Sequence, residues 1–152
     1  MCSRENPVRE EIKILGLNHL TFAVEDLEKS VELYKVIFGD RIVAISEKLA
    51  YFDVGGLWIA LNVENAISSE DRDRTYTHVA FSMTKEDQVK LKEKLDSLNI
   101  PTKSGRTRNS REGQSLYLRD YDGHLLEFHD KGLSDRLSYY KDERPDVALK
   151  TK

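Results

Sequence analysis

The apolar and polar residues of the chain form two similar patterns, one after the other. Residues 17–24 and 76–83 alternate apolar and polar side chains, which is typical of a β-strand with one buried face. After each stretch, apolar residues recur every three or four positions, which predicts an amphipathic helix. These positions are Leu27, Val31, Tyr34 and Phe38 in the first segment, and Gln88 (a polar exception), Leu91, Leu95 and Leu98 in the second. The expected N-caps are Asp26 and Thr84, and the expected helix stops are Gly39 and Asn99.

Three strand-like runs follow each predicted helix. They span 41–46, 48–55 and 57–63 in the first half, and 101–107, 114–120 and 124–130 in the second. The chain is therefore interpreted as two βαβββ modules, 14–63 and 75–130, joined by a charged link at 64–74. We expect an α+β fold with curved mixed sheets, in which residues 14–143 form a single domain. The remaining segments are a flexible N-terminal arm at 1–13, a C-terminal helix at 132–141 and a tail at 144–152.

Strand alternation also predicts which polar side chains can meet. In the first strand Leu20, Phe22 and Val24 share the face that should pack on the helices, whereas His19 and Thr21 share the other face. The same alternation groups further polar residues on the corresponding faces of later strands: Tyr51 with Asp53, His78 with Ser82, Ser115 with Tyr117, and Glu127 with His129. If each four-stranded module curls, these faces line one concavity.

Two imidazoles and one carboxylate meet in this arrangement, those of His19, His78 and Glu127. Such a set binds divalent ions and leaves coordination positions open for a substrate oxygen. The alternative is that both histidines only form hydrogen bonds in half-buried strands. Their matching positions in the two modules favour the ligand interpretation. Superposing the modules puts Ala60 at the position of Glu127, where it leaves room for substrate. The remaining candidates are weaker, namely His124 and His129.

Composition narrows the class of protein. Of 152 residues, 39% are hydrophobic and 34% are charged, which is ordinary for a globular domain. The net charge of -3 and the interspersed charges argue against nucleic-acid binding, and no apolar stretch approaches the roughly 20 residues of a membrane span. Residues 1–13 lack the apolar segment of a secretory signal. The one cysteine, Cys2, excludes an internal disulfide framework, so we expect a cytoplasmic protein.

Several segments in this order resemble a known family: LNHLTFAV, KLAYFDVGGLWIALN, YTHVAFS, GRTRN, QSLYLRDYDGHLLEFH and LSDRLSYY. Together with the duplicated modules they are similar to the vicinal oxygen chelate superfamily, which includes glyoxalase I and the extradiol dioxygenases. Within it the chain most resembles the fosfomycin-resistance proteins of the bacillithiol-using metallothiol transferase type (FosB-like), over about residues 14–143. The resemblance implies a glyoxalase-like fold and a domain-swapped homodimer.

The resemblance also implies roles for individual residues. The metal ligands are His19, His78 and Glu127, with His19 supplied by the other chain. The expected substrate contacts are Tyr51, Trp58, Tyr76, Arg106, Ser115, Tyr117 and Arg136. Thr21 could donate a hydrogen bond to the oxygen that becomes charged as an epoxide opens. Read singly, these residues have ordinary alternatives, because a basic run is usually solvated, Arg136 has Asp135 beside it, and Trp58 in an apolar strand is often core.

The implied activity is the metal-dependent addition of a low-molecular-weight thiol to the epoxide of fosfomycin, giving antibiotic resistance. Bacillithiol and L-cysteine are the expected thiols. Manganese or magnesium is the expected ion, and zinc, nickel, iron and cobalt remain open because a set of two histidines and one glutamate suits them all. The residues with expected catalytic roles are Thr21, Tyr51, Arg106 and Arg136.

Three other functions of this fold compete with this one. Thr21 and the loop REGQS resemble both the hydrolytic and the glutathione-using branches, whereas the bacillithiol type often has cysteine at the position of Thr21. The hydrolytic branch has a glutamate general base where this chain has Leu49, for which Glu47 is a weak substitute. In the glutathione branch the loop helps to bind potassium, but Arg111 replaces a serine of that loop. A non-catalytic ligand-sequestering protein is disfavoured by the complete set of metal ligands.

Overall fold

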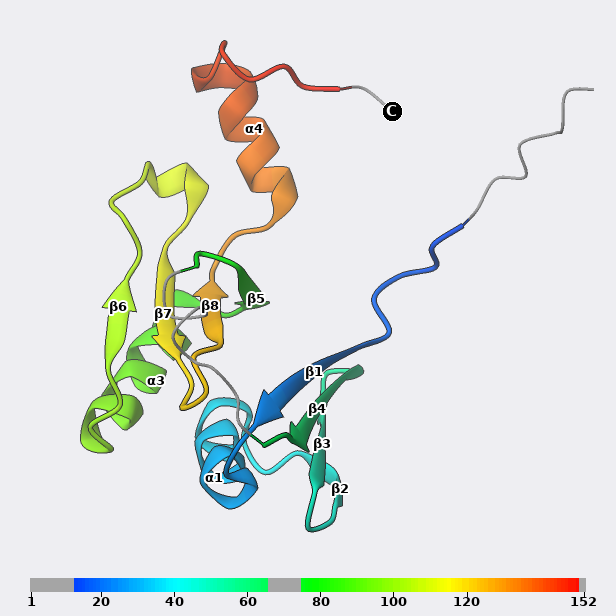
Figure 1. Ribbon diagram of the computed structural model, residues 1–152. Helices are drawn as coiled ribbons and strands as arrows, with labels where there is room; N and C mark the ends of the chain where they lie inside the picture. Colours follow the sequence, from blue (N-terminus) through cyan, green and yellow to red (C-terminus); the bar gives the residue numbers. More distant parts are fainter. Residues whose placement is uncertain (1–12, 66–74, 151–152) are drawn as a thin grey trace, which may run out of the picture.

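The first half of the chain forms a four-stranded mixed sheet with one helix (Figure 1). The structure is a computed structural model that describes residues 13–65 and 75–150. The elements of this module are β1 (His19–Val24), α1 (Leu27–Phe38), β2 (Ile42–Ile45), β3 (Leu49–Val54) and β4 (Leu57–Val63). The strand order is β1-β4-β3-β2, with β1 parallel to β4 and the other pairs antiparallel. We refer to it as the first sheet.

The second half repeats this topology. Its elements are β5 (His78–Ser82), α3 (Lys85–Ser97), β6 (Thr102–Ser104), the short helix η1 (Ser110–Glu112), β7 (Ser115–Arg119) and β8 (Leu125–His129). The order β5-β8-β7-β6, with β5 parallel to β8, matches that of the first sheet. The predicted pair of βαβββ modules is therefore confirmed. A final helix, α4 (Leu133–Glu143), rises from the end of β8 (Figure 1).

The helix signals read from the sequence hold in the structure. The side chains of Asp26 and Thr84 accept hydrogen bonds from Lys29 N and Asp87 N, as N-caps do. Gly39 ends α1 with a φ of 80°. Asn99 also has a positive φ, of 56°, one residue after the cap of α3.

Several predicted boundaries differ from those of the structure. The predicted strand 101–107 is only three residues long, and β1 begins two residues later than the predicted start at 17. The C-terminal helix was predicted at 132–141 and runs from Leu133 to Glu143. The predicted flexible arm lies outside the described residues except for its last residue, Lys13, and most of the link 64–74 and the end of the tail also lie outside them.

One hydrophobic core serves both modules. The predicted inward residues of β1 and β8, Phe22, Val24, Leu126 and Phe128, are all buried in it. The prediction for Leu98 is wrong, because its side chain is exposed just beyond the last turn of α3. The polar exception Gln88 is buried, and its amide donates hydrogen bonds to two main-chain carbonyl groups, those of Met83 and Gln114.

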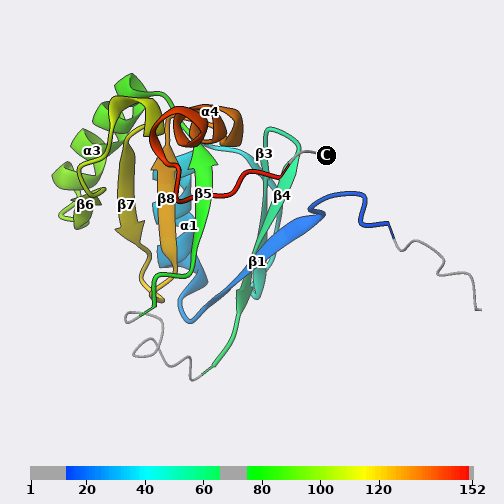
Figure 2. The same ribbon diagram turned by 90° about the horizontal axis from the view of Figure 1, so that it is seen from above.

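The two sheets lie on opposite sides of this shared core, with α1 between them (Figure 2). Aromatic rings cross the boundary between the modules, since Phe38 of α1 contacts both Phe52 and Phe81, with centroid distances of 6.0 and 5.2 Å. In each sheet the opposite face is turned away from the core. We call these the outer faces. No helix in the described residues is long and apolar enough to cross a membrane.

A buried polar cluster also ties the modules together. The hydroxyl group of Tyr34 on α1 donates to Asp120, which follows β7, at 2.8 Å. The same carboxylate oxygen contacts His124 Nδ1 at 2.8 Å. Burial and the nearby Asp120 raise the pKa of Tyr34 well above its usual value. His124 is therefore part of the contact between the modules. This agrees with the sequence analysis, in which His124 is a weaker candidate for a metal ligand.

Candidate metal centre

Strand register determines which side chains share the outer face of the second sheet. Glu127 on β8 pairs with Tyr117 on β7 and with Ala80 on β5, and Tyr117 pairs in turn with Lys103 on β6. One step along the strands, Ser115 pairs with His129. The residues of these rows point the same way because paired residues share a face.

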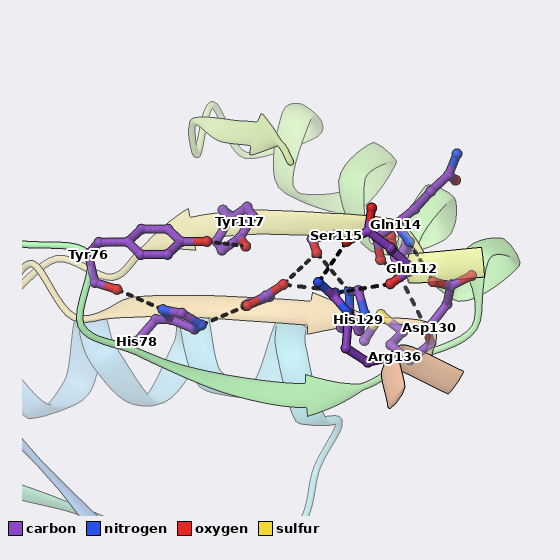
Figure 3. Close-up of polar contacts among 12 residues, drawn as sticks. Tyr76, His78, Glu112, Gln114, Ser115, Tyr117, His129, Asp130 and Arg136 are labelled. Carbon is purple, nitrogen blue, oxygen red and sulfur yellow. Dashed lines mark hydrogen bonds and ion pairs between the residues drawn. The ribbon is translucent and has the colours of Figure 1, made fainter. Parts of the chain in front are cut away.

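His78 and Glu127 form the centre of this face. His78 Nε2 lies 2.8 Å from Glu127 Oε2, and His78 Nδ1 lies 2.7 Å from the main-chain oxygen of Tyr76 (Figure 3). A carbonyl oxygen can only accept, so Nδ1 carries the proton and directs Nε2 at the carboxylate. This is how metal-binding imidazoles are usually held, with the far nitrogen donating to a carbonyl or carboxylate group.

The other oxygen of Glu127 is held by Ser115. The serine hydroxyl group donates to Glu127 Oε1 and lies 2.8 Å from His129 Nδ1 (Figure 3). Because the serine has one hydrogen and the carboxylate can only accept, His129 Nδ1 must be the donor to the serine oxygen. The orientation of the Glu127 side chain is thus fixed by Ser115 on β7 and, through that serine, by His129 on β8.

The charge of Glu127 is stabilised in spite of its burial. Burial by itself raises the pKa of this carboxyl group, but hydrogen bonds from Ser115 and Tyr117 and the nearby His78 and His129 lower it, and the net pKa lies below the usual 4.5. A buried carboxylate beside an imidazole nitrogen is a pair of cation ligands.

Two tyrosines stand at one side of this pair. Tyr76 and Tyr117 share a hydrogen bond of 2.8 Å between their hydroxyl groups (Figure 3). Burial, the bond with Tyr76 and the bond with Glu127 raise the pKa of Tyr117 above its usual value. Both rings also contact His78, at centroid distances of 4.7 and 6.0 Å. The Tyr117 phenol is therefore protonated at neutral pH.

The predicted phosphonate-binding arginines approach the same face from two segments. Arg136 on α4 donates to both the carboxylate and the main-chain oxygen of Glu112 on η1 (Figure 3). Arg111, beside it in η1, pairs with Asp142 on α4. Arg106 is exposed on the loop after β6. The two ion pairs fix α4 to η1 and hold Arg136 at the edge of the face.

A cavity of about 940 Å³ opens over this outer face. Most of the predicted site residues of the second module line it: Tyr76, His78, Arg106, Tyr117, Glu127 and Arg136. Ser115 lies beneath it as the donor to Glu127. The second sheet therefore brings close together the site residues that the sequence predicts in this module.

The other four predicted site residues lie on the outer face of the first sheet. The ring of His19 stacks on Trp58 with a centroid distance of 4.4 Å, and Trp58 contacts Tyr51 at 5.0 Å. Thr21 is exposed and pairs with Ala60. Trp58 is 39% exposed, so the alternative that it is a core residue is wrong.

One chain does not bring the two groups together. The faces that carry His19 and Glu127 are both turned away from the core that lies between the sheets. Among the described residues, no three histidine, cysteine, aspartate or glutamate side chains are close enough to hold a metal ion. His78 and Glu127 could fill two positions of a metal site, and the described part of this chain brings no third histidine, cysteine or carboxylate to them.

Sequence reasoning missed or undervalued three residues of this face. Glu112 fixes Arg136, and the capping-box spacing from Asn109 to Glu112 was the available signal. His129 is a weak ligand candidate by sequence, and in the structure it orients Ser115. Arg108 lies among several basic residues of the sequence, which are usually solvated, yet it lines the cavity.

Comparisons with known proteins find relatives over most of the chain. The family model described as Glyoxalase/Bleomycin resistance protein/Dioxygenase superfamily matches residues 16–128. A metallothiol transferase FosB of Lysinibacillus sphaericus is 44% identical over 131 residues, which are 86% of this chain and 93% of the relative. A metallothiol transferase FosB of Bacillus licheniformis is 40% identical over 140 residues, 92% of this chain and 91% of the relative.

Solved structures extend the comparison to the fold. The fosfomycin resistance protein FosX of Listeria monocytogenes, complexed with Mn(II) and a sulfate ion, is 34% identical and superposes with a TM-score of 0.74, covering 84% of this chain and 99% of that one. A mutant of the same FosX with Mn(II) and 1S,2S-dihydroxypropylphosphonic acid gives a TM-score of 0.73 at 32% identity, covering 83% and 99%. The chain therefore belongs to the glyoxalase/bleomycin resistance protein/dioxygenase superfamily and, within it, to the family of the metallothiol transferases FosB.

Proposed function

We propose that the protein is a metal-dependent transferase that adds a low-molecular-weight thiol to the epoxide of fosfomycin, giving resistance to that antibiotic. The main support is the His78–Glu127 pair at the base of a cavity lined by basic side chains, in a chain that matches metallothiol transferases over most of their length. We expect this reaction to take place in the cytoplasm, where cysteine thiols stay reduced.

His78, Glu127 and a His19 would hold the divalent ion. Imidazole nitrogen and carboxylate oxygen suit manganese, magnesium and several other ions, and the FosX relative binds Mn(II). A divalent ion there supplies Lewis acidity to the substrate oxygens. Ser115 and His129 keep the carboxylate in place, and the carbonyl group of Tyr76 keeps His78 in the correct tautomer.

The other site residues orient and stabilise the substrate. Arg106 and Arg136 neutralise the phosphonate group, and the hydroxyl groups of Tyr76 and Tyr117 offer donors beside it. Thr21 and Tyr51 approach from the first sheet, and Trp58 there walls off the methyl end of the epoxide. The thiolate sulfur bonds to one ring carbon, the bond from that carbon to the ring oxygen breaks, and the oxygen takes up a proton, so the product is a thioether alcohol.

The first sheet favours a thiol over water as the nucleophile. Hydration would need a general base near the epoxide. Leu49 has no such group, and Glu47 lies exposed in the turn between β2 and β3. Asp53 accepts a hydrogen bond from Gly56 N in the β3–β4 turn, so its carboxylate is engaged. The FosX relative binds a dihydroxypropylphosphonic acid, which is the diol that the addition of water would give. At the position of the general base this chain has Leu49 instead.

The test is a panel of nucleophiles on the purified protein. Fosfomycin is incubated with the protein and Mn(II) or Mg(II), in turn with bacillithiol, L-cysteine, glutathione or no thiol, and the phosphorus NMR signals are followed. We expect a thioether product with bacillithiol or L-cysteine. Diol formation without thiol would replace the transferase proposal with hydration. Binding of fosfomycin without consumption would replace it with sequestration.

We further propose that two chains complete each site as a domain-swapped homodimer. The outer face of the first sheet carries His19, Thr21, Tyr51 and Trp58, and it points away from the outer face of the second sheet. The first sheet of a second copy would therefore have to bring these residues to the second sheet's metal-binding pair. Trp58, Ile45 and Val43 of the first module are large apolar side chains left exposed in one chain, and α4 likewise exposes Leu133 and Leu137. Covering such groups favours association.

Mixing two inactive variants tests this arrangement. His19→Ala and Glu127→Gln each spoil both sites of a pure dimer. In a dimer of one chain of each kind, one site has both defects and the other has none. After unfolding and refolding an equimolar mixture, we expect about a quarter of wild-type activity, because half the dimers are mixed. A site built within one chain would recover no activity.

A further inference from the structure

The cavity over the second sheet is more basic than a small phosphonate epoxide requires. In one chain it measures about 940 Å³, and the first sheet of the proposed partner chain would cover part of it. Six of its lining residues are lysine or arginine and one is acidic, Glu127: the six are Lys103, Arg106, Arg108, Arg119, Lys131 and Arg136. Arg136 pairs with Glu112, and Arg119 donates to main-chain oxygens. The charge of Lys103 and Arg108 comes from β6 and the loop after it.

This charge lies at the edge of the sheet, away from the metal ligands. Lys103 pairs with Tyr117, which pairs with Glu127, so Lys103 is two strands away, or about 10 Å. Arg108 follows on the loop after β6, and its Nε atom is buried with no hydrogen-bond partner among the described residues. Only one other buried side-chain atom in the described chain lacks a partner, and it belongs to Asn62 in the first module. A buried guanidinium N–H without an acceptor is costly.

We infer that Lys103 and Arg108 form a second anion subsite, which binds a carboxylate group of the thiol co-substrate. This inference rests on the proposed function. Two anionic ligands must be held close together for the reaction, and separate cationic groups about two strands apart allow both to bind. The subsite selects thiols that carry a carboxylate at a distance from the sulfur, because the edge of β6 is remote from Glu127. Arg108 supplies planar donors to that carboxylate and Lys103 a point charge.

The experiment compares thiols and variants in a matched design. Bacillithiol carries carboxylates far from its sulfur, whereas L-cysteine carries one only beside the thiol-bearing carbon. With Arg108→Gln and with Lys103→Gln, we expect the KM for bacillithiol to rise about tenfold, which is the loss of one charge-assisted contact. The KM for fosfomycin and the KM for L-cysteine should stay within twofold. Lys92→Gln is the control, because Lys92 pairs with Asp96 on α3 and does not line the cavity.

A binding measurement separates this inference from the proposed function. S-methylbacillithiol cannot react, and its affinity for the manganese-loaded protein is measured by calorimetry in the wild type and in both variants. A tenfold loss supports the subsite even if the wild type consumes no fosfomycin, in which case only the proposed function fails. Lys103 is exposed, so Lys103→Gln should fold even if Arg108→Gln does not. Equal affinity in wild type and Lys103→Gln, or an equal rise in the KM for L-cysteine, would overturn the subsite.

Discussion

The two modules share one topology but differ in the chemistry of their outer faces. The row Thr21, Ala60, Tyr51 of the first sheet corresponds to the row Ala80, Glu127, Tyr117 of the second. The predicted match of Ala60 with Glu127 is thus confirmed by strand pairing. The first face holds a histidine among aromatic rings, whereas the second holds a histidine, a carboxylate and their hydrogen-bonded supports.

This difference teaches that a duplicated scaffold need not duplicate its ligands. In the proposed metal site, a further protein ligand in place of Ala60 would fill a coordination position, whereas a methyl group would leave that position for the substrate. The second face, with two of the three proposed ligands, should therefore contribute most to metal affinity, whereas the aromatic residues of the first face should contribute mainly to substrate binding. Changing residues on each face separately can test this division.

The largest effect is expected for Glu127→Gln. The change keeps the shape of the side chain but removes the charged ligand, so we expect turnover of fosfomycin to fall about a thousandfold, the size of a lost metal contribution of several kcal/mol. Mn(II) binding, followed by electron paramagnetic resonance, should weaken in parallel. Glu93→Gln on the exposed side of α3 serves as the control. Retention of turnover within tenfold would remove Glu127 from the ligand set.

A smaller loss is expected for Ser115→Ala, which removes the donor to Glu127 Oε1 and the acceptor for His129. Outer contacts of this kind contribute about 10–100-fold in metal affinity. The comparison variant is Ser97→Ala, whose hydroxyl group donates to Lys94 O at the end of α3. If the Mn(II) affinity of Ser115→Ala matched that of Ser97→Ala, the support of the carboxylate by β7 would be irrelevant to the ion.

A change on the first face should act differently. Trp58→Leu removes the ring that stacks on His19 and contacts Tyr51. We expect the KM for fosfomycin to rise about two- to tenfold, the range of an aromatic contact of 0.5–1.5 kcal/mol. Mn(II) affinity should change less than in Ser115→Ala. The division between the faces would be broken if the order of these two affinities were reversed.

The smallest expected effect is on the acid stability of the metal-free protein. The pKa of Glu127 is lower in the folded chain than its usual 4.5, so its ionised form stabilises the fold above that value. This contribution is lost as the pH falls below 4.5 and through the folded pKa. Denaturation by urea at pH 6, 4.5 and 3.5 should show a steeper loss of stability in the wild type than in Glu127→Gln, which keeps His78 and His129. The same dependence of stability on pH in both proteins would contradict the conclusion that ionised Glu127 stabilises the fold.

Much of the fold could be predicted because its signals are local. The alternation in β1 and the capping residues Asp26 and Thr84 depend on near neighbours in the chain, and these predictions hold. The extent of β6 could not be predicted, because only three residues pair with β7, and Gly105 after them adds one last main-chain bond to Ser115. Strand ends depend on the partner strand, which the local pattern does not include.

The individual residues of the site could be predicted from the sequence, but the contacts that hold them in place could not. Strand parity and the repeated histidine identified His78 and Glu127, which lie 2.8 Å apart. The contact of Glu112 with Arg136 joins residues 24 positions apart, because α4 folds back onto η1. The position of Arg108 at the cavity, with its Nε atom buried and unpartnered, depends on how the loop after β6 folds. No periodicity in the sequence encodes those contacts.

The back-to-back placement of the two sheets has a genetic consequence when sites form between chains. Each polypeptide then takes part in two reaction centres, giving an imidazole to one and a carboxylate to the other. A cell could express an intact allele together with an allele whose only defect is on the Glu127 face. It would lose only the reaction centres that use the second sheet of a defective chain. Two alleles with lesions on different faces would restore resistance when expressed together, although neither does so alone.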